Sequence, residues 1–373
     1  MTPVPLLDLK PQFETIREDV DRVLRRVVDS QLFILGSEVA EFEKELAAYV
    51  GVPHAIGCAS GTDALVLSLH ALDLAPGDEV ITTPFTFFAT ASCVARHGAK
   101  PVFVDIDPAT FNLDPEQIED AISPRTKVLL PVHLFGQCAD LDAIGAVARR
   151  HGLAVVEDAC QAIGASYHGK GAGSIGTTGA FSFFPSKNLG AFGDGGIITT
   201  SDDAIAARLR MLRVHGERER YKHQAIGWNS RLDALQAAVL RVKLPHLDAW
   251  SRGRIANADR YDRLFRDAGL VDSGRVVLPT RAPWGGHIFN QYTIRVKDRD
   301  ALGEHLKARG IGWAIYYPIP LHLQECFASL GYKAGDFPEA ERAAREVLSL
   351  PIFPELVPAQ LEQVVSEIAA HYR

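Results

Sequence analysis

The sequence is poor in the features that mark several special classes of protein. Its 373 residues include only five cysteines, which are odd in number, lie far apart and form no C-x-x-C pair. This favours reduced thiols in a cytoplasmic setting over a disulfide framework. No stretch approaches the ~18 apolar residues that a membrane span needs. Residues 1–10 also lack the basic start and apolar core of a signal peptide.

Blocks of like charge are absent as well. The formal net charge is −7, whereas a protein that binds nucleic acid needs a basic face for the phosphates. We therefore expect no nucleic acid and no membrane among the partners. The apolar share of 47% and the charged share of 23% are ordinary for a globular protein, and the length allows two domains.

Short apolar segments alternate with helical patterns from residue 55 to about residue 200. Strands are predicted at 80–82, 101–106, 127–132 and 154–157, and helices at 62–72 and 141–151. This alternation indicates a parallel sheet in an α/β domain. Apolar residues at helical spacing between Phe13 and Val27 add an N-terminal amphipathic helix.

The pattern changes in the last third of the chain. Residues 232–265 are predicted to be largely helical, with a break near Pro245. Strands at 292–296 and 314–317 then flank a helix at 301–309, and a final helix places Leu361, Val364, Val365 and Ile368 on one face. We therefore predict a large α/β domain over residues 1–250 and a smaller α+β domain over residues 251–373.

The most informative stretch surrounds Lys187. This lysine lies between an aromatic, strand-like run that begins at Phe181 and a glycine-rich turn at Gly193–Gly196. Burial in such a place would disfavour the ammonium form and lower the pKa of the amine. A neutral lysine can then form a Schiff base with an aldehyde. An ordinary surface lysine in a turn remains the alternative for this segment alone.

Two further segments could hold parts of a ligand. At Ala59–Leu65 a strand end turns into a helix, whose first N–H groups suit a phosphate together with the hydroxyls of Ser60 and Thr62. A simple N-cap is the commoner explanation of such a motif. Phe87 follows the strand at 80–82 and could stack on a planar ring beyond the end of the sheet, although most such residues belong to the core.

Asp158 follows the predicted strand at 154–157. A buried carboxylate is costly unless it is paired. A protonated pyridine nitrogen is a suitable partner, and pyridoxal phosphate enzymes use an acidic residue to keep that nitrogen charged. A metal ligand and a helix N-cap are alternatives. No His/Asp/Glu cluster with metal-ligand spacing accompanies Asp158, so no metal site is predicted.

Gly171–Gly176 matches the G-x-G-x-x-G pattern of dinucleotide sites. That pattern has its physical meaning only between a strand and a helix. Here an aromatic, strand-like run at 177–184 follows instead of a helix. The motif is therefore not interpreted as a nicotinamide site.

The ordered set of segments resembles the DegT/DnrJ/EryC1/StrS family of pyridoxal phosphate-dependent sugar aminotransferases. The resemblance covers nearly the whole chain, although each motif alone is weak. It is carried by these segments: Pro5–Lys10, Ile34–Gly36, Ser60–Leu65, Glu157–Ala159, Ser182–Gly190, Gly193–Gly196, Gly227–Asp233 and Tyr317–His322.

The resemblance implies a fold-type I transferase with a mostly parallel seven-stranded sheet, a smaller C-terminal domain, and a homodimer that shares its active sites. It implies that Lys187 is the catalytic Schiff-base lysine, that Asp158 pairs with the pyridine nitrogen and that Gln161 contacts the ring hydroxyl. Phe87 would stack on the ring. Ser60, Gly61, Thr62 and Ser182 would hold the phosphate, and Asn229 would reach the phosphate of the neighbouring subunit's cofactor. From the residues alone, Asn229 would be explained by an N-cap.

The substrate side rests on fewer residues. L-glutamate is the expected donor, Lys187 the group that moves the proton, and a keto sugar on a nucleotide diphosphate the acceptor, so ping-pong kinetics are expected. Arg231, Tyr316, Tyr317 and His322 are candidate substrate contacts. Structural ion pairing is an alternative for Arg231, and a surface position is an alternative for His322. Many family members have histidine where this chain has Tyr316, which leaves the sugar open.

Similarity of the segments at 215–221 and 229–233 to members that aminate C3 favours a 3-keto hexose, of 6-deoxy or glucuronate type. A 4-keto-6-deoxyhexose remains the alternative. A sugar dehydratase on the same fold would replace Lys187 with histidine. A nicotinamide dehydrogenase is a second competing class, which the position of the glycine motif at 171–176 disfavours. A non-catalytic regulator that binds the cofactor is the third class, and no appended DNA-binding module supports it.

Overall fold

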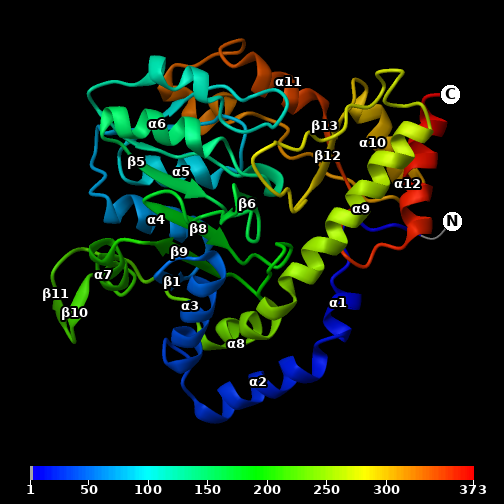
Figure 1. The fold of residues 1–373 in the computed structure, drawn as a ribbon. Coiled ribbons are helices and arrows are strands. Elements are labelled where there is room, and N and C mark those ends of the chain that lie inside the picture. The colour runs from blue at the N-terminus through cyan, green and yellow to red at the C-terminus, as the bar shows by residue number, and fades with distance from the viewer. Residues whose placement is uncertain (1–2) are drawn as a thin grey trace.

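The computed structural model describes residues 3–373. Met1 and Thr2, with which the predicted large domain begins, lie outside the described residues. A seven-stranded sheet forms the centre of the larger part, in the order β1-β9-β8-β5-β4-β2-β3 (Figure 1). Its strands are β1 (His54–Cys58), β2 (Glu79–Thr82), β3 (Lys100–Phe103), β4 (Thr126–Leu129), β5 (Ala154–Asp158), β8 (Thr178–Ser182) and β9 (Gly196–Thr200).

The sheet is mostly parallel, as the sequence predicts. Only β9 runs against its neighbours β1 and β8, whereas the pairings from β8 to β3 are all parallel. Strands buried on both faces of a parallel sheet are apolar throughout, which explains the short Val/Ile/Leu runs of β2, β4 and β5. The carboxyl ends of β5 and β8 lie side by side, with Asp158 opposite Ala180.

Helices cover both faces of this sheet (Figure 1). The predicted N-terminal helix is present but divided in two at Thr15–Ile16. The helices of this part are α1 (Lys10–Glu14), α2 (Arg17–Ser30), α3 (Ser37–Val50), α4 (Gly61–Ala71), α5 (Ala89–Arg96), α6 (Leu141–His151), α7 (Asp203–Leu212) and α8 (Ala234–Lys243).

Smaller elements decorate this part. The two-stranded ribbon β6–β7 precedes β8, and the hairpin β10–β11 projects from the lower left of Figure 1. The bounds are β6 (Ser166–Tyr167), β7 (Lys170–Gly171), β10 (Glu217–Glu219) and β11 (Lys222–His223); short 3₁₀ turns occupy Pro115–Gln117, Glu119–Ala121, Leu134–Gly136 and Leu244–His246.

The C-terminal part is a smaller α+β unit, also as predicted. Its antiparallel pair β12 (Tyr292–Arg295) and β13 (Val347–Leu350) packs against helices, and the predicted final helix buries Leu361, Val364, Val365 and Ile368. The other elements are α9 (Leu247–Asp267), α10 (Arg299–Ala308), α11 (Pro338–Glu346), α12 (Pro358–His371) and 3₁₀ turns at Leu321–Leu323 and Glu325–Leu330.

The strand predicted at 314–317 is wrong. Ala314 makes only an isolated bridge to Ser349, with backbone hydrogen bonds of 3.1 and 2.8 Å. Residues 315–317 form no further bridge to β13, and Pro318, which has no N–H to donate, could not extend a ladder beyond them. The strand that pairs with β12 is β13, which follows α11 directly and was not predicted.

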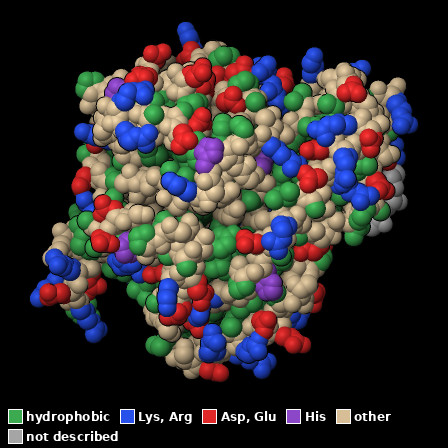
Figure 2. Space-filling model, in the orientation of Figure 1, with side chains coloured by type: hydrophobic (Ala, Val, Ile, Leu, Met, Phe, Trp, Pro, Cys, Tyr) green, Lys and Arg blue, Asp and Glu red, His purple; other side chains and the backbone are tan. Residues whose placement is uncertain are grey.

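The long helix α9 runs diagonally between the two parts (Figure 1). Its first turns place Trp250 against Ile16 and Val20, whereas Tyr261 and Phe265 enter the C-terminal core, which also contains Val4. α9 continues unbroken through residue 250, so no break in the helix marks the domain boundary predicted there. That boundary stays a prediction. Cationic and anionic side chains are interspersed over the face in view (Figure 2).

Candidate active site

Lys187 lies in the loop that follows β8. Its backbone N–H donates to the Phe184 carbonyl over 2.8 Å, which closes a turn after the aromatic strand. Burial lowers the pKa of the Lys187 ammonium, although nearby Cys160 and Asp158 favour the charged form. The amine is thus partly dehydrated and lies close to the end of β5, as a nucleophilic lysine requires.

Asp158 is the last residue of β5 and is 5% exposed. Its Oδ2 accepts a hydrogen bond from the Thr90 hydroxyl at 2.8 Å, and its Oδ1 accepts from the Cys160 N–H at 3.2 Å. Since Thr90 donates its only hydroxyl proton to Asp158, the Thr86 hydroxyl donates to Thr90 at 3.0 Å. No cation of residues 3–373 forms an ion pair with Asp158, so this buried carboxylate suits an additional cationic partner.

The N-terminus of α4 is pressed against the other two segments. A Cβ on Gly61 would lie 2.6 Å from the Cβ of Ser182 and 2.9 Å from the Sγ of Cys160. Only glycine fits there. The first N–H groups of α4 have no partner within the helix. Ser60 is the N-cap of α4, and its hydroxyl accepts from the Asp63 N–H at 3.1 Å. The N-cap explanation is therefore confirmed, and a phosphate role for Ser60, Gly61, Thr62 and Ser182 stays a prediction.

Gln161 connects the end of β5 to the C-terminal part. Its Oε1 accepts from the Phe135 N–H at 2.8 Å, and its Nε2 donates to the Tyr317 hydroxyl at 3.0 Å. The ring of Tyr317 lies 6.2 Å from that of Phe87, which is 55% exposed. Tyr316 is half-buried beside them. The structure therefore brings Lys187, Asp158, Gln161, Phe87 and Tyr317 together from four separate segments, since Asp158 and Gln161 both belong to the end of β5.

The structure tests the simple explanations that were considered for three further predicted residues. His322 is 2% exposed, and its Nε2 lies 3.1 Å from Glu341 Oε1, so the surface position considered for it is wrong. Asn229 is exposed and caps no helix, because the N-cap of α8 is Asp233. Arg231 is half-buried and forms no ion pair within the described part of the chain, so structural ion pairing does not explain it.

The glycine motif at 171–176 has a different task from a dinucleotide site. The N–H groups of Gly173, Ile175 and Gly176 donate to the Glu157 carboxylate over 2.7, 2.7 and 2.5 Å. No helix follows the motif, since β8 begins at Thr178. The loop therefore binds an anion, and this anion is a side chain of the same protein.

Sequence reasoning missed Glu157 and its partner His133. His133 Nδ1 accepts from the Ala139 N–H at 3.2 Å, so Nε2 carries the proton and donates to Glu157 Oε2 at 2.8 Å. The signal was the pair Glu157–Asp158, because consecutive strand residues point to opposite faces and both carboxylates end a buried strand. Thr90 was also missed; its spacing of four from Thr86 was the available signal.

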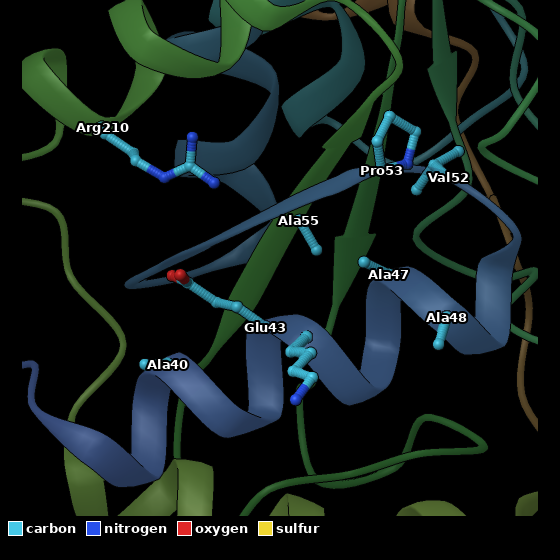
Figure 3. Close-up of a pocket in the computed structure, with 9 residues that line it drawn as sticks. Ala40, Glu43, Ala47, Ala48, Val52, Pro53, Ala55 and Arg210 are labelled. Atoms are coloured by element: carbon cyan, nitrogen blue, oxygen red, sulfur yellow. The ribbon is translucent and has the colours of Figure 1, made fainter.

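The groove drawn in Figure 3 is a different feature. It lies beside α3 and is lined by Ala40, Glu43, Lys44, Ala47, Ala48, Val52, Pro53, Ala55 and Arg210. It contains no predicted site residue. Within residues 3–373 no group of three His, Cys, Asp or Glu side chains could hold a metal ion, and no helix is long and apolar enough to cross a membrane.

Comparison with known proteins places this geometry in a wider context. The model of the DegT/DnrJ/EryC1/StrS aminotransferase family matches residues 14–369. A pleiotropic regulatory protein of Geobacillus stearothermophilus is 55% identical over 370 residues, 99% of each chain. The UDP-N-acetyl-3-dehydro-alpha-D-glucosamine 3-aminotransferase of Acidithiobacillus ferrooxidans is 46% identical over 367 residues, 98% of this chain and 97% of the relative.

A similar solved structure is that of S. venezuelae DesV in complex with a ketimine intermediate. It has a TM-score of 0.96 and 46% sequence identity, and the match covers 100% of both chains. The fold of fold-type I aminotransferases, predicted from the sequence, is thereby confirmed.

Proposed function

This chain belongs to the DegT/DnrJ/EryC1/StrS aminotransferase family, and on that premise we propose that it transfers an amino group from L-glutamate to C3 of a keto sugar on a nucleotide diphosphate. The cofactor is pyridoxal phosphate. The observation that carries the proposal is the meeting of a dehydrated Lys187 with the unpaired carboxylate of Asp158 at the ends of adjacent strands.

The residues at this point of the sheet fit the cofactor. Asp158 has neutral donors but no cation, which suits a protonated pyridine nitrogen. The tight contact of Gly61 with Ser182 and Cys160 brings the α4 N-terminus close enough to hold a phosphate. Lys187 would hold the cofactor covalently through its Nζ, Gln161 and Phe87 would contact the ring, and Ser60, Thr62 and Ser182 would bind phosphate oxygens. Asn229 is exposed in the single chain and would reach the phosphate of the neighbouring subunit's cofactor.

Pyridoxal phosphate, when bound, supplies an electron sink that stabilises charge on the carbon that loses its proton. Lys187 Nζ takes that proton from the donor and later returns one to the acceptor carbon, as a general base and acid. The Asp158 carboxylate would favour the protonated, positively charged form of the pyridine nitrogen. Tyr317 and Gln161 fix one another by their hydrogen bond, and Phe87 shields one face of the pocket from water.

The amination position follows the relatives. The name of the Acidithiobacillus relative specifies a 3-aminotransferase of a UDP-linked 3-dehydro sugar, which supports C3 here. Arg231 and Tyr316 are proposed to contact the sugar nucleotide. For His322, which is buried against Glu341, a contact with the substrate stays a prediction. A 4-keto-6-deoxyhexose is the alternative substrate.

A homodimer is part of the proposal. Phe184 and Phe192, on either side of Lys187 along the chain, are 54% and 47% exposed, and Leu32 and Ile34 are exposed as well. Apolar side chains of this size beside a reactive lysine support cover by a second copy. Sedimentation should give twice the chain mass of 40.7 kDa. All five cysteines are free thiols, which supports a cytoplasmic location.

A regulatory role without catalysis is the second candidate, because the Geobacillus relative carries a regulatory name. One experiment separates the two. Purified protein reconstituted with pyridoxal phosphate should show a visible band that borohydride removes and that Lys187→Ala lacks. A panel of nucleotide-linked 3-keto and 4-keto sugars with L-glutamate should then yield 2-oxoglutarate and one aminated sugar. A stable visible band would favour the regulator if no 2-oxoglutarate forms from L-glutamate with any of the acceptors.

A further inference from the structure

Arg254 is a buried cation without a carboxylate partner. It lies on α9 and is 4% exposed. Its Nη1 donates to the carbonyls of Phe289, Asn290 and Ile352 over 3.1, 3.4 and 2.9 Å. Among the described residues Arg254 forms no ion pair within 4.0 Å, and its three hydrogen bonds all come from Nη1. Burial lowers the pKa of Arg254 to about 10, against the weaker opposing effect of Glu355.

The guanidinium lines a small cavity next to the candidate active site. The cavity volume is about 50 Å³, and its polar lining comes from Ser186, Asn290, Gln291, Tyr316 and Ser349. Ser186 directly precedes Lys187, and Tyr316 directly precedes Tyr317, whose hydroxyl is bound by Gln161. The cavity therefore lies against the two chain segments that carry Lys187 and Tyr317.

The size and chemistry of the cavity select the kind of ligand. A water molecule needs roughly 10–15 Å³ of such space, so the cavity holds one carboxylate and is far too small for a sugar nucleotide. A guanidinium binds a carboxylate through parallel N–H groups, and Nε and Nη2, which take no part in the three bonds to carbonyls, form one edge of that fork. Serine, asparagine and glutamine side chains supply further neutral donors.

We propose that Arg254, with Ser186 and Asn290, binds a carboxylate of the dicarboxylic amino donor. This inference rests on the proposed function, in which L-glutamate is that donor. It also explains why a cation is retained where an apolar side chain would pack at lower cost. The competing explanation is that Arg254 only ties together the three carbonyls on its Nη1.

Glutarate, a dicarboxylate without an amine, is the probe that separates these explanations, because it binds without reacting. Calorimetry on the full chain loaded with pyridoxal phosphate should give a Kd for glutarate that rises about 10- to 100-fold in Arg254→Met. Ser186→Val, which fills the cavity from an exposed position, should raise it at least about 10-fold while Arg254 is kept. Arg252→Met, on the exposed face of the same helix, should leave the Kd unchanged.

The L-glutamate half-reaction, followed by the loss of the visible band, provides the second readout. Its apparent Kd should rise in the same two variants. Unchanged glutarate binding in a folded Ser186→Val protein, or in Arg254→Met, would overturn the proposal while leaving the aminotransferase function intact. If Arg254→Met does not fold, Ser186→Val decides. Glutarate binding that depends on Arg254, in a wild type that does not react with L-glutamate, would keep the site and refute the donor.

Discussion

His133 Nε2 lies 2.8 Å from Glu157 Oε2, and both side chains are fully buried. The Glu157 carboxylate also accepts three backbone N–H groups from the loop of Gly173 to Gly176. Four donors around one carboxylate satisfy it completely. This arrangement anchors the end of β5 next to Asp158, and the backbone N–H of His133 also donates to the Asp158 carbonyl at 3.0 Å.

Glu157→Gln should strongly destabilise the fold. The amide would turn an N–H₂ group toward donors that need an acceptor, so several buried N–H groups lose their partner. We expect a loss of about 3 kcal/mol in the free energy of unfolding, measured by urea denaturation of the cofactor-free protein. Glu116→Gln, on an exposed turn, is the matched control. A loss below that of the control would show that the cluster contributes no stability.

The same carboxylate should make stability depend on acid. Burial alone would raise the pKa of Glu157, but the hydrogen bonds from His133, Gly176 and Gly173 outweigh it and hold the pKa below its ordinary value. A carboxylate with a depressed folded-state pKa binds protons less well than in the unfolded chain. Its stabilisation is therefore complete above the ordinary glutamate pKa and is lost as the pH falls through the lower, folded-state value.

Urea midpoints measured from pH 7 down to pH 3 check this. The wild type should lose stability over the acid range faster than Glu157→Gln, which has no group to titrate at this position. Parallel curves for the two proteins would contradict the assignment.

The parts of the site differ in how well the sequence predicts them. Lys187 and Asp158 are predictable because each is a charged residue in a setting that burial makes costly. Gly61 is predictable as part of a helix start, but its contact with Ser182 and Cys160 arises only from the pairing of distant strands. The link of Gln161 to Tyr317 is hidden because Tyr317 belongs to a segment that was predicted to be a strand. The glycine motif was not interpreted as a nicotinamide site, but the binding of the Glu157 carboxylate by its N–H groups could not be predicted, because this contact depends on how the loop folds against β5.

Gly61→Ala should disrupt the site more than the fold. The new methyl group would overlap the Ser182 Cβ and the Cys160 Sγ, which costs roughly 1–3 kcal/mol and pushes α4 away from the end of β8. We expect the Kd for pyridoxal phosphate, measured by fluorescence quenching, to rise at least about 10-fold. Gly145→Ala, inside α6 and near only the flexible tip of Arg149, should keep wild-type affinity. Cofactor binding unchanged in Gly61→Ala would place the phosphate elsewhere.

Thr90→Val tests the donor to Asp158. Valine keeps the shape of threonine but removes the hydroxyl that donates to Asp158 Oδ2 at 2.8 Å. A hydrogen bond to a charged group contributes about 1.5–3 kcal/mol, so the free energy of unfolding of the cofactor-free protein should fall by about that amount. Thr90→Ser keeps the hydroxyl and should recover most of it. Equal stability of the valine and serine variants would show that Asp158 does not depend on this bond.

Lys187→Met should separate stability from activity. Since burial lowers the pKa of Lys187, the folded chain binds the proton of this amine less well than the unfolded chain does. The charged lysine therefore destabilises the fold at neutral pH, and this cost disappears as the pH rises through the ordinary lysine pKa. Methionine removes the charge at similar length, so the cofactor-free variant should melt at a higher temperature than the wild type at pH 7.

The two proteins should converge near pH 11, and the variant should lose aminotransferase activity by about 10³-fold or more. Lys127→Met, at an exposed position of β4, should change neither property. A Lys187→Met protein that melts at or below the wild-type temperature would mean that Asp158 and Cys160 stabilise the ammonium more than burial destabilises it. The neutral amine required for the Schiff base would then have to arise only after the cofactor enters.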